Sequence, residues 1–358
     1  MLKVIFGDIR GWFPNEECIL HAQIKCHWRL SVESFFYYMA KIYDIEVYYT
    51  KADVEQVKRL AKLIPVHKYI GKPIECDKLY SNYRFSAETT TSDKYHLIHY
   101  DPLNVGFSTT YEDGWKYIGV SKVACKGYEA KTGHKAELIY NPVPIEKKGL
   151  KKYDGLNLIS ATRLTSEKGL KRIVKLSNLL DKAGINYTWT IYTNRVRQAR
   201  NKISSKNVIL KEQTLNIHDE IEKSSWLIQL SDCESFGLSV CEALILGTPV
   251  IITDLEAFKE IGCIHGKNAV VCNFDMTNVD IDMIVKGLPK FEYTPPKSEW
   301  DKYLSRNKIY NPNELIEVTT KKRFWDLETN NHYIRNEKIK VSRTRASELE
   351  CLDIVEVL

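Results

Sequence analysis

Two glutamates, Glu234 and Glu242, stand eight positions apart in the stretch SDCESFGLSVCEALILGTPVIITD, residues 231–254. An ionised carboxylate accepts two hydrogen bonds at once, so each side chain suits a pair of neighbouring hydroxyls on a sugar or a ribose. The apolar run 226–230 predicts a strand and residues 238–247 a helix, which places Glu234 in the loop between them and Glu242 about one turn into the helix. The alternative is a solvated loop acid and an exposed helix residue.

The junction of this strand, loop and helix also suits a phosphate. The loop after a parallel strand lies at the ligand-binding edge of the sheet, and the start of the next helix offers unpaired N–H groups and a positive dipole end. Gly237 lets the backbone come close to a ligand, Leu238 opens the helix, and Phe236 is placed to wall the site. This stretch therefore predicts a site for a phosphorylated sugar.

A second group of residues follows another predicted strand, in ISATRLTSEKGLKRIV, residues 159–174. Its loop carries Arg163 and Lys168, ahead of a helix that begins near Gly169. Two cations at the carboxyl edge of a parallel sheet would neutralise a pyrophosphate and support its departure as a leaving group. The structural alternative is a solvated basic loop.

Short apolar runs alternate with helical patterns along the chain, which indicates an α/β protein with parallel sheets. In the first half the expected strands are residues 2–6, 45–49, 78–81, 96–99, 117–121 and 137–140, with a helix at 32–43. In the second half they are residues 156–161, 188–193, 207–210, 226–230 and 249–253, with a helix from 169 to 182. The amphipathic stretch 54–64 favours a helix that faces the core over one that contacts a membrane.

The length of 358 residues favours more than one domain. Residues 141–155 combine two prolines, two glycines and several lysines, which is typical of an exposed linker. We therefore predict one domain over 1–148, a second over 149–321, and a small C-terminal module over 322–358. The module is expected to hold a hairpin around residues 329–331, then a strand, a short helix and a terminal strand.

Composition limits the class of protein. The nine cysteines are scattered without C-x-x-C pairs, no signal peptide or membrane span is evident, and the expectation is a reduced, cytoplasmic protein. The net charge of +6 is compatible with a polyanionic ligand and with weak peripheral contact to an anionic membrane. Dinucleotide dehydrogenases and P-loop NTPases lack support, because G-x-G-x-x-G and G-x-x-x-x-G-K-[ST] are both missing. The acids at 280–282 fit helix capping better than metal binding.

The segments ISATRLTSEKGL, NVIL and ESFGLSVCEALILGTPVIITD together resemble the donor domain of the family-four retaining glycosyltransferases. The hallmark of that family is two glutamates separated by seven residues and followed by a G-T-P-V strand. The resemblance implies the GT-B fold, with two Rossmann-like domains facing across a cleft, here followed by a small C-terminal addition.

The resemblance also implies roles for individual residues. Arg163 and Lys168 would bind the donor diphosphate, Glu234 would contact the transferred sugar as a catalytic residue, and Glu242 would hold the nucleotide ribose. Backbone contacts to sugar and phosphate would come from Phe236, Gly237 and Leu238. The base would lie near Leu210 and Lys211.

The first half resembles the family in two further places. Members carry a glycine-rich loop after the first strand, often with paired glycines; here FGDIRGWF offers Gly7, assigned to the donor diphosphate, and Gly11, and it lacks the pair. The segment HLIHYDP resembles the strand end where the family has an active-site histidine, and we assign His99 rather than His96. The alternative for His99 is a histidine satisfied beside a core strand.

The expected activity is transfer of a sugar from a nucleotide diphosphate donor, UDP-linked by expectation, with retention and without a metal or other cofactor. The acceptor is a hydroxyl on a glycan, a lipid-linked glycan, a protein or a modified base of nucleic acid. Two alternatives are another GT-B enzyme, such as a nucleotide-sugar epimerase or a phosphorylase, and a non-catalytic protein that binds sugar nucleotides.

Overall fold

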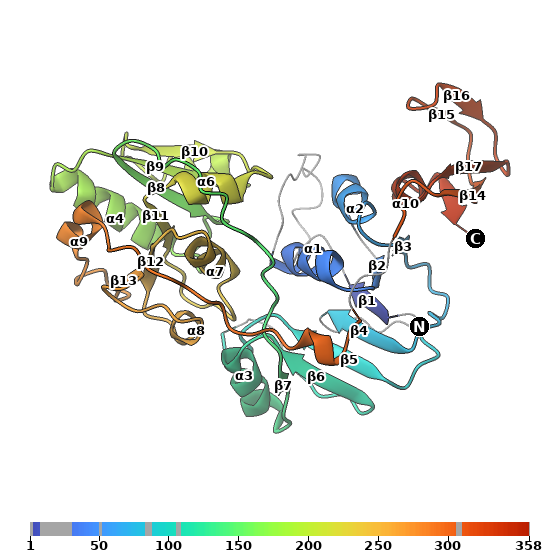
Figure 1. Ribbon diagram of the computed structural model, residues 1–358, viewed down its shortest axis with the longest axis horizontal. Coiled ribbons are helices and arrows are strands. Elements are labelled where there is room, and N and C mark those ends of the chain that lie inside the picture. Colours follow the sequence, from blue (N-terminus) through green and yellow to red (C-terminus); the bar gives the residue numbers. More distant parts are fainter. Residues whose placement is uncertain are drawn as a thin grey trace.

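The computed structural model describes residues 3–7, 31–49, 52–82, 88–104, 109–305 and 310–357. Two parallel sheets, each flanked by helices, lie in the two halves of the molecule, and a small antiparallel module follows at the carboxyl end (Figure 1). Gly11 and the rest of the predicted glycine-rich loop lie outside the described residues, whereas Gly7 ends the first strand. Within the described ranges, no helix is long and apolar enough to cross a membrane.

The first sheet has seven strands in the order β3-β2-β1-β4-β5-β6-β7. Every neighbouring pair is parallel, which requires a crossover between consecutive strands. The strands are β1 (Lys3–Gly7), β2 (Glu46–Tyr49), β3 (Val66–Lys68), β4 (Lys78–Asn82), β5 (Lys94–Ile98), β6 (Trp115–Gly119) and β7 (Glu137–Leu138). The crossover helices are α1 (Ser31–Ile42), α2 (Val54–Leu60) and α3 (Lys122–Thr132).

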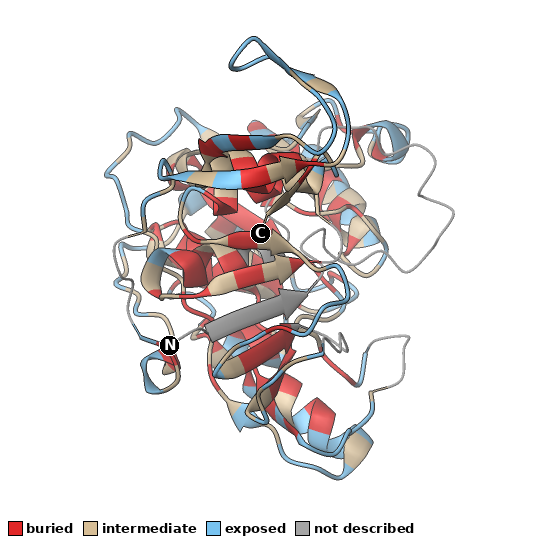
Figure 2. Ribbon diagram, turned by 90° about the vertical axis from the view of Figure 1, so that its right-hand side faces the viewer, coloured by how far each residue is buried: buried red, intermediate tan, exposed pale blue. Residues whose placement is uncertain are grey.

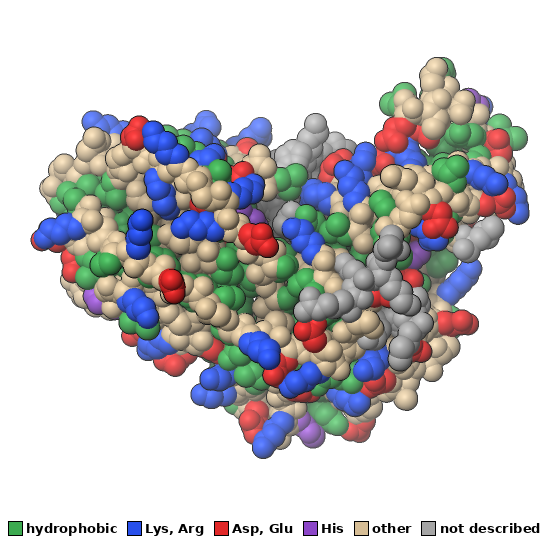
Figure 3. Space-filling view, viewed as in Figure 1, with side chains coloured by type: hydrophobic (Ala, Val, Ile, Leu, Met, Phe, Trp, Pro, Cys, Tyr) green, Lys and Arg blue, Asp and Glu red, His purple; other side chains and the backbone are tan. Residues whose placement is uncertain are grey.

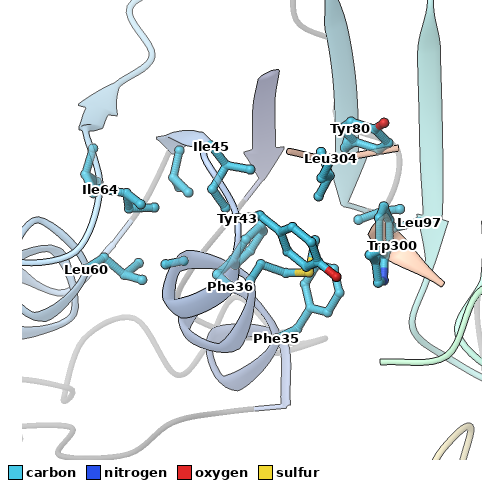
Figure 4. Close-up of a cluster of buried hydrophobic side chains, with 14 of the residues drawn as sticks. Phe35, Phe36, Tyr43, Ile45, Leu60, Ile64, Tyr80, Leu97, Trp300 and Leu304 are labelled. Carbon is cyan, nitrogen blue, oxygen red and sulfur yellow. The ribbon is translucent and has the colours of Figure 1, made fainter. Parts of the chain in front are cut away.

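Helices α1 and α2 cover one face of this sheet and bury its core (Figure 4). Phe35 and Phe36 of α1 and Leu60 of α2 are almost fully buried, so α2 faces the core as the amphipathic pattern predicts. Trp300, from a short 3-10 helix (η2, Trp300–Lys302), joins the same cluster, with its ring 5.9 Å from that of Phe35 and 5.6 Å from that of Tyr80. The chain therefore returns to the first half to complete its core.

The second sheet has six parallel strands in the order β10-β9-β8-β11-β12-β13. They are β8 (Leu156–Ala161), β9 (Tyr187–Tyr192), β10 (Val208–Lys211), β11 (Trp226–Gln229), β12 (Val250–Thr253) and β13 (Ala269–Cys272). Its helices are α4 (Leu170–Lys182), α5 (Val196–Ala199), α6 (Ile217–Lys223), α7 (Leu238–Ile245), α8 (Glu256–Glu260) and α9 (Ile281–Lys286). Strands β11 and β12 are buried on both faces, which accounts for their continuous apolar sequences. In the first sheet, which faces the viewer in Figure 2, buried residues likewise lie along the strands and exposed residues in the connections.

The C-terminal module consists of two small antiparallel sheets and one helix. Strands β14 (Leu315–Thr320), β17 (Lys338–Ser342) and β18 (Val355–Val357) form one sheet, and β15 (Phe324–Asp326) pairs with β16 (Asn331–Tyr333) as a hairpin. This arrangement confirms the predicted hairpin, strand, helix (α10, Arg343–Cys351) and terminal strand.

Helix α10 fixes the module to the first sheet. The Ser347 hydroxyl donates to the Val66 carbonyl (2.9 Å) and the Lys68 N–H donates to a carboxylate oxygen of Glu350 (3.0 Å). Both backbone partners belong to β3, the edge strand of the sheet. The module thus covers an edge that would otherwise present unpaired backbone groups.

The domain boundaries stay predictions, but the elements differ from them in two places. Residues 300–304, which fall in the predicted second domain, pack in the core of the first sheet. Strand β14, residues 315–320, pairs with β17 and β18, although the predicted module begins at 322. In both places the boundary depends on contacts between residues far apart in sequence.

The carboxyl group of Glu350 gives the contact between module and sheet a pH dependence. Burial raises the pKa of Glu350 to about 7. Because this pKa lies above its unfolded value, the folded state binds more protons, and stability is lost as pH rises from about 4.5 through 7. Glu350→Gln should remove up to about 3 kcal/mol of this loss, measured by urea unfolding at pH 5 and pH 8.

Glu328→Gln, which alters an exposed carboxylate of the same module (54% exposed), is the matched control and should retain the wild-type pH dependence. An unchanged slope for Glu350→Gln would contradict the assignment.

Candidate active site

Two loops meet at the carboxyl edge of the second sheet because their strands are neighbours. Strands β8 and β11 pair in parallel, with Leu158 opposite Trp226 and Ile159 opposite Leu227. The loop after β8 leads into α4 and the loop after β11 leads into α7. Parallel strands end at the same edge, so the residues of both loops come together there.

The two loops interlock through Gly169. This residue caps the start of α4 with a φ of 78°, a conformation that side chains rarely adopt. A Cβ added at Gly169 would lie 1.8 Å from the carbonyl oxygen of Leu230, in the other loop. The same oxygen accepts a hydrogen bond from Nε of Arg172 (2.8 Å), and the Asp232 N–H donates to the Glu167 carbonyl (2.8 Å).

The interlocked loops bring Lys168 and Glu234 together. Nζ of Lys168 lies 2.7 Å from Oε1 of Glu234, and the two side chains are only 19% and 14% exposed. The same oxygen accepts hydrogen bonds from Ser231 Oγ (2.8 Å) and Gln229 Nε2 (3.0 Å). Within the described part of the chain Oε2 has no hydrogen-bond partner, so one carboxylate oxygen is held and the other is available.

The charge state of Glu234 follows from these contacts. Burial alone would raise the pKa of Glu234, but the Lys168 ammonium and the hydrogen bonds from Ser231 and Gln229 hold it below its usual value. The carboxylate is therefore ionised at neutral pH and can accept a hydrogen bond from a ligand hydroxyl.

Arg163 lies in the same loop as Lys168 but has a different partner. Its Nη2 is 3.5 Å from Oε1 of Glu167, in a pair whose side chains are 33% and 45% exposed. An exposed pair of this kind is weak, so little free energy opposes a move of the guanidinium toward an anion. The described contacts do not join Arg163 to Glu234.

Phe236, Gly237 and Leu238 form the turn into α7. The Phe236 side chain is 2% exposed and belongs to the core of the second sheet, so only its backbone is available to a ligand. Gly237 has a φ of 80°, and a Cβ there would lie 2.7 Å from the Phe258 ring. The close approach of α7 to Phe258 thus depends on a glycine at the helix start.

Glu242 faces the first half of the molecule from the second turn of α7. Its Oε1 accepts a hydrogen bond of 2.5 Å from the Tyr38 hydroxyl of α1 and lies 3.5 Å from Nε2 of His218 in α6. Glu242 is 7% exposed, and within the described residues its Oε2 has no hydrogen-bond partner. Sequence reasoning did not find Tyr38 or His218, because neither lies near a recognisable motif and their contact with Glu242 exists only in the folded chain.

His99 directly follows β5 and lies against α1, with its ring centre 4.5 Å from that of Phe35. Its backbone carbonyl accepts a hydrogen bond from Ser235 Oγ (2.8 Å), which brings it beside the loop of Glu234. Among the described residues, the buried Nε2 has no hydrogen-bond partner. Burial lowers the pKa of His99 to about 3, so the imidazole is uncharged at neutral pH.

The remaining predicted site residues form no described contact with Lys168 or Glu234. Leu210 and Lys211 end β10, the edge strand of the second sheet, and Nζ of Lys211 lies 5.9 Å from the centre of the Tyr192 ring. Gly7 lies opposite Tyr49 at the carboxyl end of β1. Sequence reasoning did not assign a role to Ser231 or Gln229, which orient Glu234. Across the described residues no group of three or more His, Cys, Asp and Glu side chains is placed to hold a metal ion.

The two parallel α/β units and the site at their facing edges define a protein of the GT-B fold. Residues 144–303 match the family model of the glycosyl transferases group 1, which spans the donor-side loops described above. The match identifies a domain of the glycosyl transferases group 1 at these residues.

Two solved structures, HepE and WaaG, agree on the fold. HepE of Anabaena, solved in complex with UDP and glucose, has a TM-score of 0.56 and 12% identity, over 80% of this chain and 89% of HepE. WaaG, a glycosyltransferase involved in lipopolysaccharide biosynthesis, has a TM-score of 0.50 and 11% identity, over 79% of this chain and 89% of WaaG. For TarM the TM-score is 0.47 and the identity 17%, over 58% of this chain and 46% of TarM. No curated protein sequence matches the chain.

The Gly169 contact can be tested against a matched glycine. Gly169→Ala should destabilise the protein by about 3 kcal/mol or more, because both the positive φ and the overlap with the Leu230 carbonyl oppose a side chain. Gly184→Ala is the control, since Gly184 has a φ of 66° but nothing within 4 Å of an added Cβ. Equal losses in urea unfolding would contradict a role for the contact with Leu230.

The buried imidazole of His99 predicts a loss of stability in acid. Since its folded pKa lies below the unfolded value, its contribution is complete above about pH 6.5 and is lost as pH falls toward 3. Between pH 7 and pH 5 the loss should be about 2 kcal/mol, and it should disappear in His99→Asn. His134→Asn, at an exposed histidine, should keep the wild-type acid dependence in the same urea titrations.

Proposed function

We propose that the protein transfers a sugar, with retention, from a UDP-linked donor to a hydroxyl acceptor, and that it needs no metal ion. The observation that carries the proposal is the contact of 2.7 Å between Lys168 and Glu234 beside the start of α7. An ammonium group, a carboxylate and the N–H groups of a helix start lie together there, and groups of these kinds suit a phosphate and sugar hydroxyls.

The diphosphate of the donor would lie at the start of α7. The N–H groups of the first helical turn lack partners within the helix, and the dipole there favours an anion. Lys168 is adjacent, and Arg163 can exchange its weak contact with Glu167 for a contact with phosphate. Gly237 and Leu238 would bring the backbone against the phosphate oxygens.

The two glutamates would hold the two sugars of the donor. The available Oε2 of Glu234 would accept a hydrogen bond from the transferred sugar, and that of Glu242 would accept one from the ribose. The base would then extend toward Leu210 and Lys211 at the end of β10. HepE, which has the same fold, was solved with UDP and with UDP-glucose, and this supports a UDP-linked donor here.

The reaction requires the bond between the anomeric carbon and the β-phosphate oxygen to break and the acceptor oxygen to bond to the same carbon. The proton of the acceptor hydroxyl would pass to an oxygen of the departing diphosphate. Negative charge develops on the departing diphosphate, where Arg163, Lys168 and the helix start stabilise it. The uncharged His99 would contact the sugar from the other side without adding a competing cation. In this proposal the two side-chain cations supply the positive charge that a metal supplies in other phosphate chemistry.

The acceptor is proposed only as a class, a hydroxyl on a glycan, a lipid-linked glycan, a protein or a modified nucleic acid. WaaG, which has the same fold, is involved in lipopolysaccharide biosynthesis, and this is compatible with a glycan or lipid-linked acceptor. The first sheet, at whose edge Gly7 and His99 lie, would form the acceptor side of the site.

Removal of either cation should slow the reaction. Arg163→Ala and Lys168→Ala should each lower turnover of UDP-glucose, followed as UDP release, by about 100-fold or more, since each removes a charge that stabilises the leaving group. Lys171→Ala is the matched control, because Lys171 is an exposed lysine on α4.

UDP binding measured by calorimetry distinguishes a loss of donor binding from a loss of turnover alone. Weaker binding together with slower turnover supports the assigned diphosphate site. Unchanged turnover in both variants would remove that site, and formation of a sugar epimer from the donor alone would identify an epimerase instead.

A further inference from the structure

The hairpin of β15 and β16 projects from the C-terminal module (Figures 1 and 2). Three large apolar side chains on it are exposed, with exposed fractions of 61% for Trp325, 87% for Leu327 and 61% for Ile334. They are among the most exposed large apolar side chains in the described part of the chain. Single exposed apolar residues are common, but three of them on one short hairpin indicate an interaction surface.

The hairpin holds these side chains outward. Successive residues of a strand point to opposite faces. Phe324 and Tyr333 face the module, with their rings 5.2 Å apart in its core, so Trp325 and its cross-strand partner His332 face away. The Trp325 indole N–H donates to Oδ1 of Asn330 (3.2 Å), which fixes the ring across the turn.

The inner face of the hairpin is anchored by a buried ion pair. Asp326 is fully buried, and its carboxylate lies 2.6 Å from Nη2 of Arg345 in α10. This guanidinium also contacts Glu348 (2.7 Å) and Glu328 (3.5 Å). The hairpin is therefore a fixed part of the module, and its two acids, Asp326 and Glu328, contact Arg345 of α10.

The charges that remain on the outside are mostly positive. Arg323, Arg335 and Lys340 form no ion pair with any described residue. Of the acids, Asp326 is buried against Arg345, Glu328 contacts the same guanidinium but is 54% exposed, and Glu337 accepts a hydrogen bond from the Ile334 N–H (2.9 Å). Arg323 is two positions before Trp325 and shares its face, and Arg335 directly follows Ile334. Figure 3 shows the hairpin standing clear of the rest of the molecule. We call Arg323, Trp325, Leu327, Ile334 and Arg335 the hairpin surface.

We propose that the hairpin surface docks the protein on a membrane that contains anionic lipids. Trp325, Leu327 and Ile334 would enter the boundary between headgroups and acyl chains, where tryptophan is favoured and apolar side chains leave water. Arg323 and Arg335 would contact lipid phosphates, since the surface potential of anionic lipids attracts cations within a Debye length. This proposal does not depend on the donor site.

Charge favours a membrane over a second copy of the chain as the occupant. In a two-fold symmetric dimer the same patch faces itself, so the two arginines of one copy would lie against the positively charged patch of the other. Like charges brought together in an apolar contact oppose association. An anionic lipid surface offers complementary charge as well as an apolar layer.

The test is co-sedimentation of the full chain with vesicles of phosphatidylcholine alone or with about 30% phosphatidylglycerol. We expect binding to the anionic vesicles that weakens as salt is raised, and little binding to the neutral ones. Trp325→Ser combined with Leu327→Ser should lower the vesicle partition coefficient by about tenfold or more. Arg323→Ser combined with Arg335→Ser should lower it and remove most of its salt dependence.

The matched control is Val285→Ser, which alters an exposed apolar residue (48% exposed) on α9 of the second sheet and should bind like the wild type. Circular dichroism verifies that each variant is folded. The proposal is overturned if the hairpin variants bind as the wild type does, or if neutral and anionic vesicles bind equally. It is also overturned if sedimentation equilibrium shows a dimer that the Trp325 and Leu327 changes dissociate.

Discussion

The contact between Gly169 and the Leu230 carbonyl is the constraint on which the candidate site depends. It joins the loops after β8 and β11 at a distance that excludes any side chain. Only with the loops this close can Lys168 reach a carboxylate that stands 66 positions later in the chain. The ion pair then sets the ionisation of Glu234, so a steric requirement at one glycine determines the electrostatics of the site.

Much of the fold is readable from the sequence, because parallel strands that are buried on both faces leave continuous apolar runs. The runs at 226–230 and 249–253 correspond to β11 and β12, and residues 169–182 correspond to α4. Strands β3, β13 and β14 were missed. The first two are only three and four residues long, and β14 mixes exposed, partly buried and buried residues, so none carries a clear pattern.

The candidate site likewise contains residues that the sequence predicts and residues that it does not. Lys168, Glu234 and Gly237 were predictable, since they follow strands at positions where a parallel sheet binds ligands. Tyr38 and His218 were not, because their contact with Glu242 depends on how two halves of the chain meet. The Phe236 side chain was expected to wall the site, yet it packs in the core. A single sequence does not reveal which side of a loop a side chain takes.

The return of the chain to Trp300 has a consequence for how the two sheets can move. The second sheet begins after β7 ends at Leu138, and η2 at residues 300–302 rejoins the first core (Figure 1). The second unit is therefore an insertion within the first, attached by two connections rather than one. Two connections restrict the relative rotation of the two units more than one would. We expect the facing edges to open and close by a hinge rotation about the line that joins the two connections.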